Sequence, residues 1–170
     1  ACYIFEKNSV GNWVQKQKIV ASDRGSDHWF GQSVSISGNF ALVGSRDWTT
    51  GSFQTLLPGS AYLFERTPGG VWIERQKIKA SDGHWRDKFG MELCISGSVA
   101  AIAAPHESHD VNGTNYKKEA GAVYIFEKDA SGVFKEVQKI VSSDRGESDN
   151  FGIGGVDISG STIVVGAPYE

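Results

Sequence analysis

Histidine, tryptophan and arginine side chains gather in short segments that precede a Phe-Gly dipeptide. Two such segments, residues 28–29 and 84–86, place imidazole, indole and guanidinium groups side by side. Aromatic rings stack on sugars and on apolar side chains, while neighbouring polar groups orient the ligand. Such residues suit a binding surface for a protein or a glycan, although packing of these rings on neighbouring loops is the favoured interpretation. The candidate binding residues are His28, Trp29, Trp48, His84, Trp85 and Arg86.

Patterns that would carry catalysis do not occur. The four histidines lie outside any His-Glu-x-x-His pair, the cysteines are not paired at metal-binding spacing, and no nucleophile elbow is found. The glycines of residues 152–155 are followed by a strand-like run, whereas a phosphate loop opens a helix. The sequence predicts that the chain is not an enzyme and binds no cofactor.

One polar loop faintly resembles a calcium loop. Asp110, Asn112 and Asn115 surround Gly113, but the loop has a single carboxylate and lacks the distal glutamate that completes a calcium site. A polar turn is therefore favoured, and calcium is retained as a weak alternative. Asn112 also begins an Asn-Gly-Thr sequon, so it is a glycosylation candidate if the protein is secreted by a eukaryote.

Acidic residues recur at fixed distances from Phe-Gly. One aspartate stands seven residues before each phenylalanine, and we expect it to cap backbone N–H groups at the start of a loop; a metal or substrate role is the alternative. A second acidic residue shifts by one position between copies, which predicts a solvated loop. The fixed aspartates are Asp23, Asp82 and Asp144. The shifting ones are Asp27, Asp87 and Asp149.

The elements that must position these residues occur three times. A Tyr-x-Phe-Glu segment starts at Tyr3, Tyr62 and Tyr124, with a Gln-Lys-Ile segment downstream of each copy. Each repeat holds four short apolar segments, which in one copy are residues 92–96, 99–103, 123–127 and 134–140. A Ser-Gly pair joins the first two, which is short enough for a tight hairpin. The sequence therefore predicts an all-β fold of three four-stranded antiparallel blades of a β-propeller.

The three copies resemble the FG-GAP repeat of integrin alpha-chain propellers. The third copy carries both Phe-Gly and Gly-Ala-Pro, the second reads Ala103-Ala104-Pro105, and the first reads Val43-Gly44-Ser45. The resemblance implies that each phenylalanine plugs between blades near the axis and that its glycine permits close backbone approach. The structural motif residues are Phe30, Gly31, Phe89, Gly90, Phe151 and Gly152. Integrin-type calcium loops are not expected in these hairpins, because two residues cannot supply six to eight oxygen ligands.

Residues 1–170 are expected to form a single propeller region, with repeats at about 1–44, 45–104 and 105–170. Because about 4–8 blades close a propeller, we expect the remaining blades to come from the same chain or from a second copy. The net charge of −3 argues against a basic surface that would bind nucleic acid. No apolar run is long enough to insert into a membrane. Cys2 and Cys94 are interpreted mainly as small strand side chains, with a disulfide as the alternative.

These observations favour a non-enzymatic recognition or scaffold module for protein–protein adhesion or assembly. A carbohydrate-binding propeller is the first alternative. A hydrolase is the second, and it would need carboxylates or histidines that converge at the channel mouth. The family resemblance implies a location outside the cell or at its surface.

Overall fold

The computed structural model describes residues 1–25, 28–46 and 58–170, and every regular element within them is a β-strand. In chain order the strands are β1 (Cys2–Lys7), β2 (Trp13–Ile19), β3 (Phe30–Ser37), β4 (Phe40–Ser45), β5 (Ser60–Arg66), β6 (Trp72–Ile78), β7 (Leu93–Ser96), β8 (Val99–Ala104), β9 (Ala122–Lys128), β10 (Phe134–Ile140), β11 (Val156–Ser159) and β12 (Thr162–Val165). Across these described ranges, no helix is long and apolar enough to cross a membrane.

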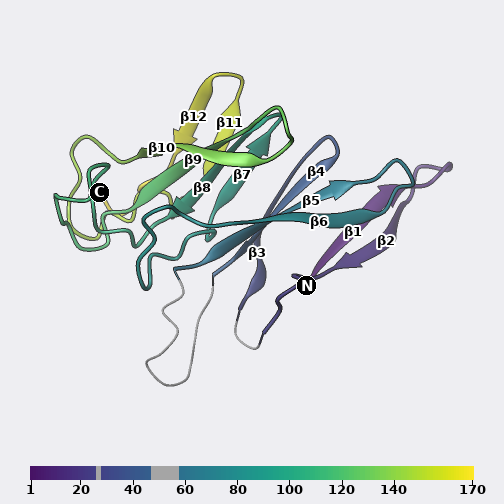
Figure 1. Ribbon diagram of the computed structural model, residues 1–170, viewed down its shortest axis with the longest axis horizontal. Coiled ribbons are helices and arrows are strands. Elements are labelled where there is room, and N and C mark those ends of the chain that lie inside the picture. The colour runs from purple at the N-terminus through teal and green to yellow at the C-terminus, as the bar shows by residue number, and fades with distance from the viewer. Residues whose placement is uncertain (26–27, 47–57) are drawn as a thin grey trace.

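The strands form four antiparallel sheets that fan out in chain order (Figure 1). Two sheets, β3-β4-β5-β6 and β7-β8-β9-β10, have the four strands expected of a propeller blade; we call them the first and second blades. The β1-β2 hairpin carries the Tyr-x-Phe and Gln-Lys-Ile segments, which in the complete blades form the two outer strands. The β11-β12 hairpin follows Phe-Gly and corresponds to the two inner strands. The predicted all-β propeller architecture is confirmed. Two blades are complete, and the other two sheets each hold two strands. The expected repeat boundaries fall at the ends of β4 and β8, inside a sheet.

Tight turns join β3 to β4, β7 to β8 and β11 to β12. Ser37 pairs with Phe40 and Ser96 with Val99, so only two residues form each loop. The first loop residue is Gly38 in one sheet, with φ 56°, which a glycine adopts without the steric penalty of a Cβ. The predicted two-residue hairpins are confirmed, and calcium binding there stays unfavoured for lack of oxygen ligands.

The strands that follow the three Phe-Gly segments lie next to one another. β3 contacts β7, and β7 contacts β11. The Ser35 Oγ accepts a hydrogen bond from the Ile95 N–H at 3.1 Å, and the Ser37 Oγ accepts one from the Gly97 N–H at 2.9 Å. Cys94 is a buried free thiol in this layer, and Cys2 is a partly buried free thiol. The strands that follow Phe-Gly are therefore the innermost strands of the fan.

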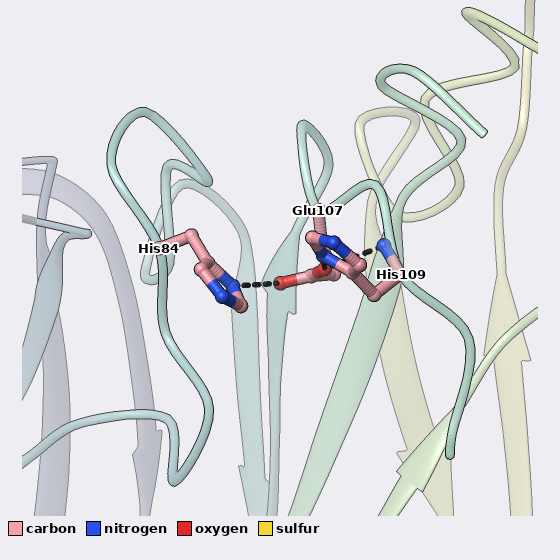
Figure 2. Close-up of side chains that lie close together, drawn as sticks. All are labelled: His84, Glu107 and His109. Atoms are coloured by element: carbon pink, nitrogen blue, oxygen red, sulfur yellow. Dashed lines mark hydrogen bonds and ion pairs between the residues drawn. The ribbon is translucent and has the colours of Figure 1, made fainter. Parts of the chain in front are cut away.

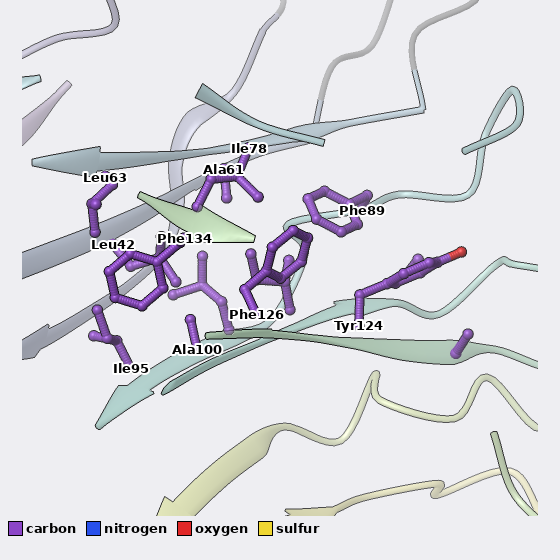
Figure 3. Close-up of a cluster of buried hydrophobic side chains, with 14 residues drawn as sticks. Leu42, Ala61, Leu63, Ile78, Phe89, Ile95, Ala100, Tyr124, Phe126 and Phe134 are labelled. Atoms are coloured by element: carbon purple, nitrogen blue, oxygen red, sulfur yellow. The ribbon is translucent and has the colours of Figure 1, made fainter. Parts of the chain in front are cut away.

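The largest apolar cluster lies between the first and second blades (Figure 3). Phe89 is fully buried in it and meets Tyr124 and Phe126 edge-on, with ring centroids 5.5 and 6.1 Å apart. Leu42 and Leu63 of the first blade belong to the same cluster. Phe89 is thus surrounded by residues of both blades and holds their faces together.

Outer strands are joined by a repeated glutamine contact. The Gln17 side chain of β2 donates to the Trp72 carbonyl at 2.7 Å and accepts from the Trp72 N–H at 2.8 Å. Gln76 of β6 makes the same pair of bonds with Phe134 of β10, at 2.7 and 3.0 Å. Each glutamine therefore satisfies the backbone at the start of the next outer strand, and this fixes the spacing of neighbouring sheets.

Candidate binding site on the rim of the second blade

The fixed aspartates connect one sheet to the next. The Asp23 carboxylate, which follows β2, accepts a hydrogen bond from the Tyr62 hydroxyl at 2.7 Å and pairs with the Lys77 ammonium at 2.6 Å. Asp82, which follows β6, binds Tyr124 and Lys139 of the second blade in the same way, at 2.6 and 2.7 Å. The expected capping of backbone N–H groups is therefore not the main role of these two carboxylates. Their principal partners are side chains of the neighbouring sheet.

Asp144 stands at the corresponding place after β10 and has different partners. Its carboxylate accepts from the Ser142 hydroxyl and shares a hydrogen bond with Glu170. The tyrosine and lysine that complete the other two contacts come from the outer strands of the following sheet, whereas only inner strands, β11 and β12, follow Asp144. The hydrogen-bond partners of the fixed aspartate therefore depend on which strands the neighbouring sheet contains.

The Asp23 contact predicts a stability that depends on pH. The hydrogen bond from Lys77, followed by that from Tyr62, holds the pKa of Asp23 below its ordinary value of 3.8 in spite of partial desolvation. A carboxyl whose pKa is lowered by folding stabilises the protein above its unfolded pKa, and this stabilisation is lost as the pH falls through the folded pKa. The side chain is 47% exposed, so solvent screening limits the effect to about 0.5–1 kcal/mol.

We expect Asp23→Asn to unfold at lower urea concentration than the parent chain at about pH 7 and at the same concentration at about pH 2. Tyr62→Phe keeps the Lys77 ion pair and should retain part of the pH dependence. An equal loss from Asp23→Asn at both pH values would mean that the charge of the carboxylate contributes nothing.

Two loops that are far apart in sequence meet over the second blade (Figure 2). His84 lies between β6 and β7, whereas Glu107 and His109 lie in the loop between β8 and β9. The His84 Nδ1 is 3.9 Å from the Glu107 Oε2, and the His109 Nδ1 is 3.1 Å from the Glu107 Oε1. The two imidazole centroids are 4.7 Å apart. Glu107 is fully buried, and its carboxylate lies beneath the two more exposed histidine rings.

Several donors keep the buried Glu107 ionised. Burial opposes the charge, but the backbone N–H of His109 donates to the carboxylate at 2.6 Å and Lys139 lies 3.6 Å from it. Together with Asp87 these contacts lower the pKa of Glu107. Burial, followed by repulsion from Glu107, raises the pKa of Asp87 to about 8, so Asp87 carries the proton of the pair at neutral pH. The Tyr124 hydroxyl is 3.3 Å from the other Glu107 oxygen.

The prediction that the shifting acidic residues belong to a solvated loop is wrong for two of them. Asp87 and Asp149 are buried, and each carboxylate accepts a hydrogen bond from the backbone N–H three residues earlier, at His84 and Gly146. Their position is set by this local turn, because the backbone closes around the carboxylate. Asp27 lies outside the described residues.

The long β8–β9 loop is tied down along its length. Arg145, from the loop after β10, donates to the carbonyls of Ser108 and Asn115 at 3.1 and 3.0 Å. The Asp110 carboxylate accepts from the N–H groups of Asn112 and Thr114 at 2.9 and 3.1 Å. These contacts describe a polar turn closed by its own carboxylate. Asn112 is exposed, and its glycosylation stays a prediction.

Two of the predicted binding residues present broad surfaces. Trp29 and Trp85 are 55% and 52% exposed, and each ring has a guanidinium over it: Arg46 at 4.9 Å and Arg86 at 4.1 Å from the ring centroids. Arginine stacking limits the motion of the indole and leaves the remainder of its surface in solvent. His28 is partly buried beside Trp29. Trp48 lies outside the described residues.

The structure brings His84 together with two residues that the sequence analysis did not select, Glu107 and His109. The hydrolase alternative requires convergent carboxylates or histidines at the channel mouth, whereas this cluster lies in the β6–β7 and β8–β9 loops over the second blade. One sequence signal could have drawn attention to Glu107: a glutamate stands two residues after proline both here and at Glu170. The convergence of all three depends on how two loops fold over one blade.

The fanned four-stranded sheets, joined through their Phe-Gly segments, define a repeat protein of the β-propeller class. The FG-GAP repeat matches residues 13–64, 72–126 and 134–170. The chain belongs to the FG-GAP repeat family. No curated protein sequence matches it.

Proposed function

We propose that the chain is a non-enzymatic recognition module that binds a protein partner through the rim loops of the first and second blades, in adhesion or assembly at the cell surface or outside the cell. The observation that carries this proposal is the pair of arginine-stacked tryptophans, Trp29 and Trp85, each more than half exposed. Tryptophan and arginine are the residues most enriched among those that dominate binding energy at protein interfaces.

Rigid loops support this assignment. The contacts of Asp23 and Asp82 fix the start of the two loops that carry Trp29 and Trp85, and Arg145 fixes the β8–β9 loop. A surface whose side chains are already ordered loses less conformational entropy on binding. Membership of the FG-GAP repeat family, whose repeats are common in adhesion proteins, supports the proposed extracellular location.

The test uses a peptide display library and a glycan array as probes of the purified chain. Peptides selected by the parent chain should lose at least about tenfold in affinity on Trp85→Ala, which is the loss expected of a dominant interface residue. Trp13→Ala is the matched control, because Trp13 is also more than half exposed, lies under the Lys7 ammonium and sits on β2, away from the rim.

Peptide ligands that are insensitive to both Trp85→Ala and Trp29→Ala would contradict binding at the rim. Glycan ligands that are lost on the same substitutions, in the absence of peptide ligands, would replace the protein-binding proposal with the carbohydrate-binding alternative.

A further inference from the structure

The His84, Glu107 and His109 cluster has the composition and the size of a metal site. One ligand atom from each residue lies within 4.8 Å of the others. Two imidazole nitrogens and one carboxylate oxygen form a donor set that Zn²⁺ accepts while keeping one coordination position open. Calcium prefers a shell of oxygen atoms only, so nitrogen donors select against it. We propose that these three residues bind one Zn²⁺ ion at the rim of the second blade.

The distances require only small side-chain movements. Zinc–nitrogen and zinc–oxygen bonds of about 2.0–2.2 Å place the ligand atoms of a tetrahedral site about 3.3–3.6 Å apart. The two separations between histidine nitrogens and Glu107 oxygens, 3.1 and 3.9 Å, lie on either side of that range. His84 is 57% exposed on its side chain, which gives an ion a path from solvent to the buried carboxylate.

The residues behind the cluster act as a supporting shell. Tyr124 and Lys139 hold the Glu107 carboxylate from below, and the Asp87 carboxylate accepts a hydrogen bond from the His84 backbone N–H. Outer contacts of this kind orient metal ligands. The Lys139 ammonium opposes a cation, but it is paired with Asp82 at 2.7 Å, so the ionised Asp82 and Glu107 carboxylates outweigh its single positive charge.

A bound ion would join two loops of different origin. His84 belongs to the same inter-blade loop as Trp85 and Arg86, whereas Glu107 and His109 belong to the β8–β9 loop. Zinc would therefore fix the loop that presents Trp85 at the rim. The partner-binding proposal rests on Trp29 and Trp85, whereas the zinc proposal rests on His84, Glu107 and His109, so either proposal can fail without the other.

The experiment titrates ZnCl2 into the metal-stripped full chain by calorimetry and repeats thermal unfolding with and without zinc. We expect one ion per chain, a dissociation constant in the micromolar range or below, and a higher midpoint with zinc, because an ion that binds only the folded state stabilises it. His84→Ala and His109→Ala should each weaken zinc binding at least about tenfold while the metal-free protein keeps its fold, as followed by circular dichroism.

His106→Ala is the matched control. His106 lies in the same loop as His109, but its ring contacts Lys88 at 2.6 Å and Glu119 at 3.8 Å, so its loss should leave zinc binding unchanged. The proposal is overturned if His84→Ala and His109→Ala bind zinc as tightly as the parent chain, if His106→Ala weakens binding as strongly as they do, or if CaCl2 binds the site as tightly as zinc.

Discussion

Replacing Phe89 with alanine is expected to lower the free energy of unfolding by about 3–5 kcal/mol, the range for removing a large aromatic ring from a packed core. The ring is fully buried and packs edge-on against Tyr124 and Phe126 of the second blade. Residues of the first blade close the same cluster, so the cavity would lie at the junction of two sheets. Strands on both sides would have to move together to fill it, which makes full relaxation unfavourable.

Urea unfolding followed by circular dichroism measures this loss, and Phe30→Ala is the control. Phe30 meets Tyr62 and Phe64 at 5.4 and 6.0 Å, almost the same geometry, but it is only partly buried. Its removal should therefore cost clearly less than that of Phe89. A change of less than about 0.5 kcal/mol for Phe89→Ala, the size expected of an ordinary surface substitution, would refute its role between the blades.

Gly121→Ala is expected to destabilise the fold by about 3 kcal/mol or more, because steric overlap adds to backbone strain. A Cβ at this position would lie 2.3 Å from the Phe151 nitrogen and 2.4 Å from its oxygen. Both atoms belong to the backbone, and the two residues form an isolated parallel bridge, so neither side can move away without breaking it. The φ angle of 88° is itself unfavourable for any residue with a Cβ.

Gly97→Ala separates these two contributions. Gly97 also has a positive φ, 59°, but a Cβ there would meet no atom within 4 Å. Alanine at position 97 should therefore cost only about 1–2 kcal/mol, the strain of a left-handed backbone. Comparison of the two unfolding midpoints gives the steric contribution, and equal losses would show that close approach at Gly121 contributes nothing.

The same close approach occurs between the first and second blades. Gly59 forms the corresponding parallel bridge with Phe89, and a Cβ on it would lie 2.1 Å from the Phe89 oxygen. The Phe-Gly dipeptide of one sheet is therefore placed against a glycine that precedes the third strand of the sheet before it. The phenylalanine ring fills the space between two sheets, and the glycine before the third strand lets the phenylalanine backbone come close. These residue types therefore recur together.

Much of the fold could be predicted from the sequence because its determinants are local. Alternation of short apolar segments with Ser-Gly turns gave the strands and their two-residue hairpins, and repetition of Phe-Gly gave the number of repeats. Hairpin pairing depends on loop length and on residues a few positions apart. Such patterns are visible along the chain without knowledge of how the sheets pack.

The site was predicted only in part, for a related reason. Trp85 and Arg86 are adjacent in sequence, so their joint position on one loop was foreseeable. Their exposure was not, since burial depends on the loops that pack around them. Two outcomes came from the tertiary structure alone: the partners of Asp23 and the burial of Asp87. An aspartate after an outer strand looks like a turn residue until the next sheet supplies a tyrosine and a lysine.

The sequence by itself thus determined the class of element, the turn lengths and the repeat. The tertiary structure decided which distant side chains meet. Glu107 and His109 reach His84 because the inter-blade loop and the β8–β9 loop lie at the same end of the second blade. That meeting depends on the stacking of sheets, which is set by contacts between residues far apart along the chain and leaves no periodic trace in the sequence.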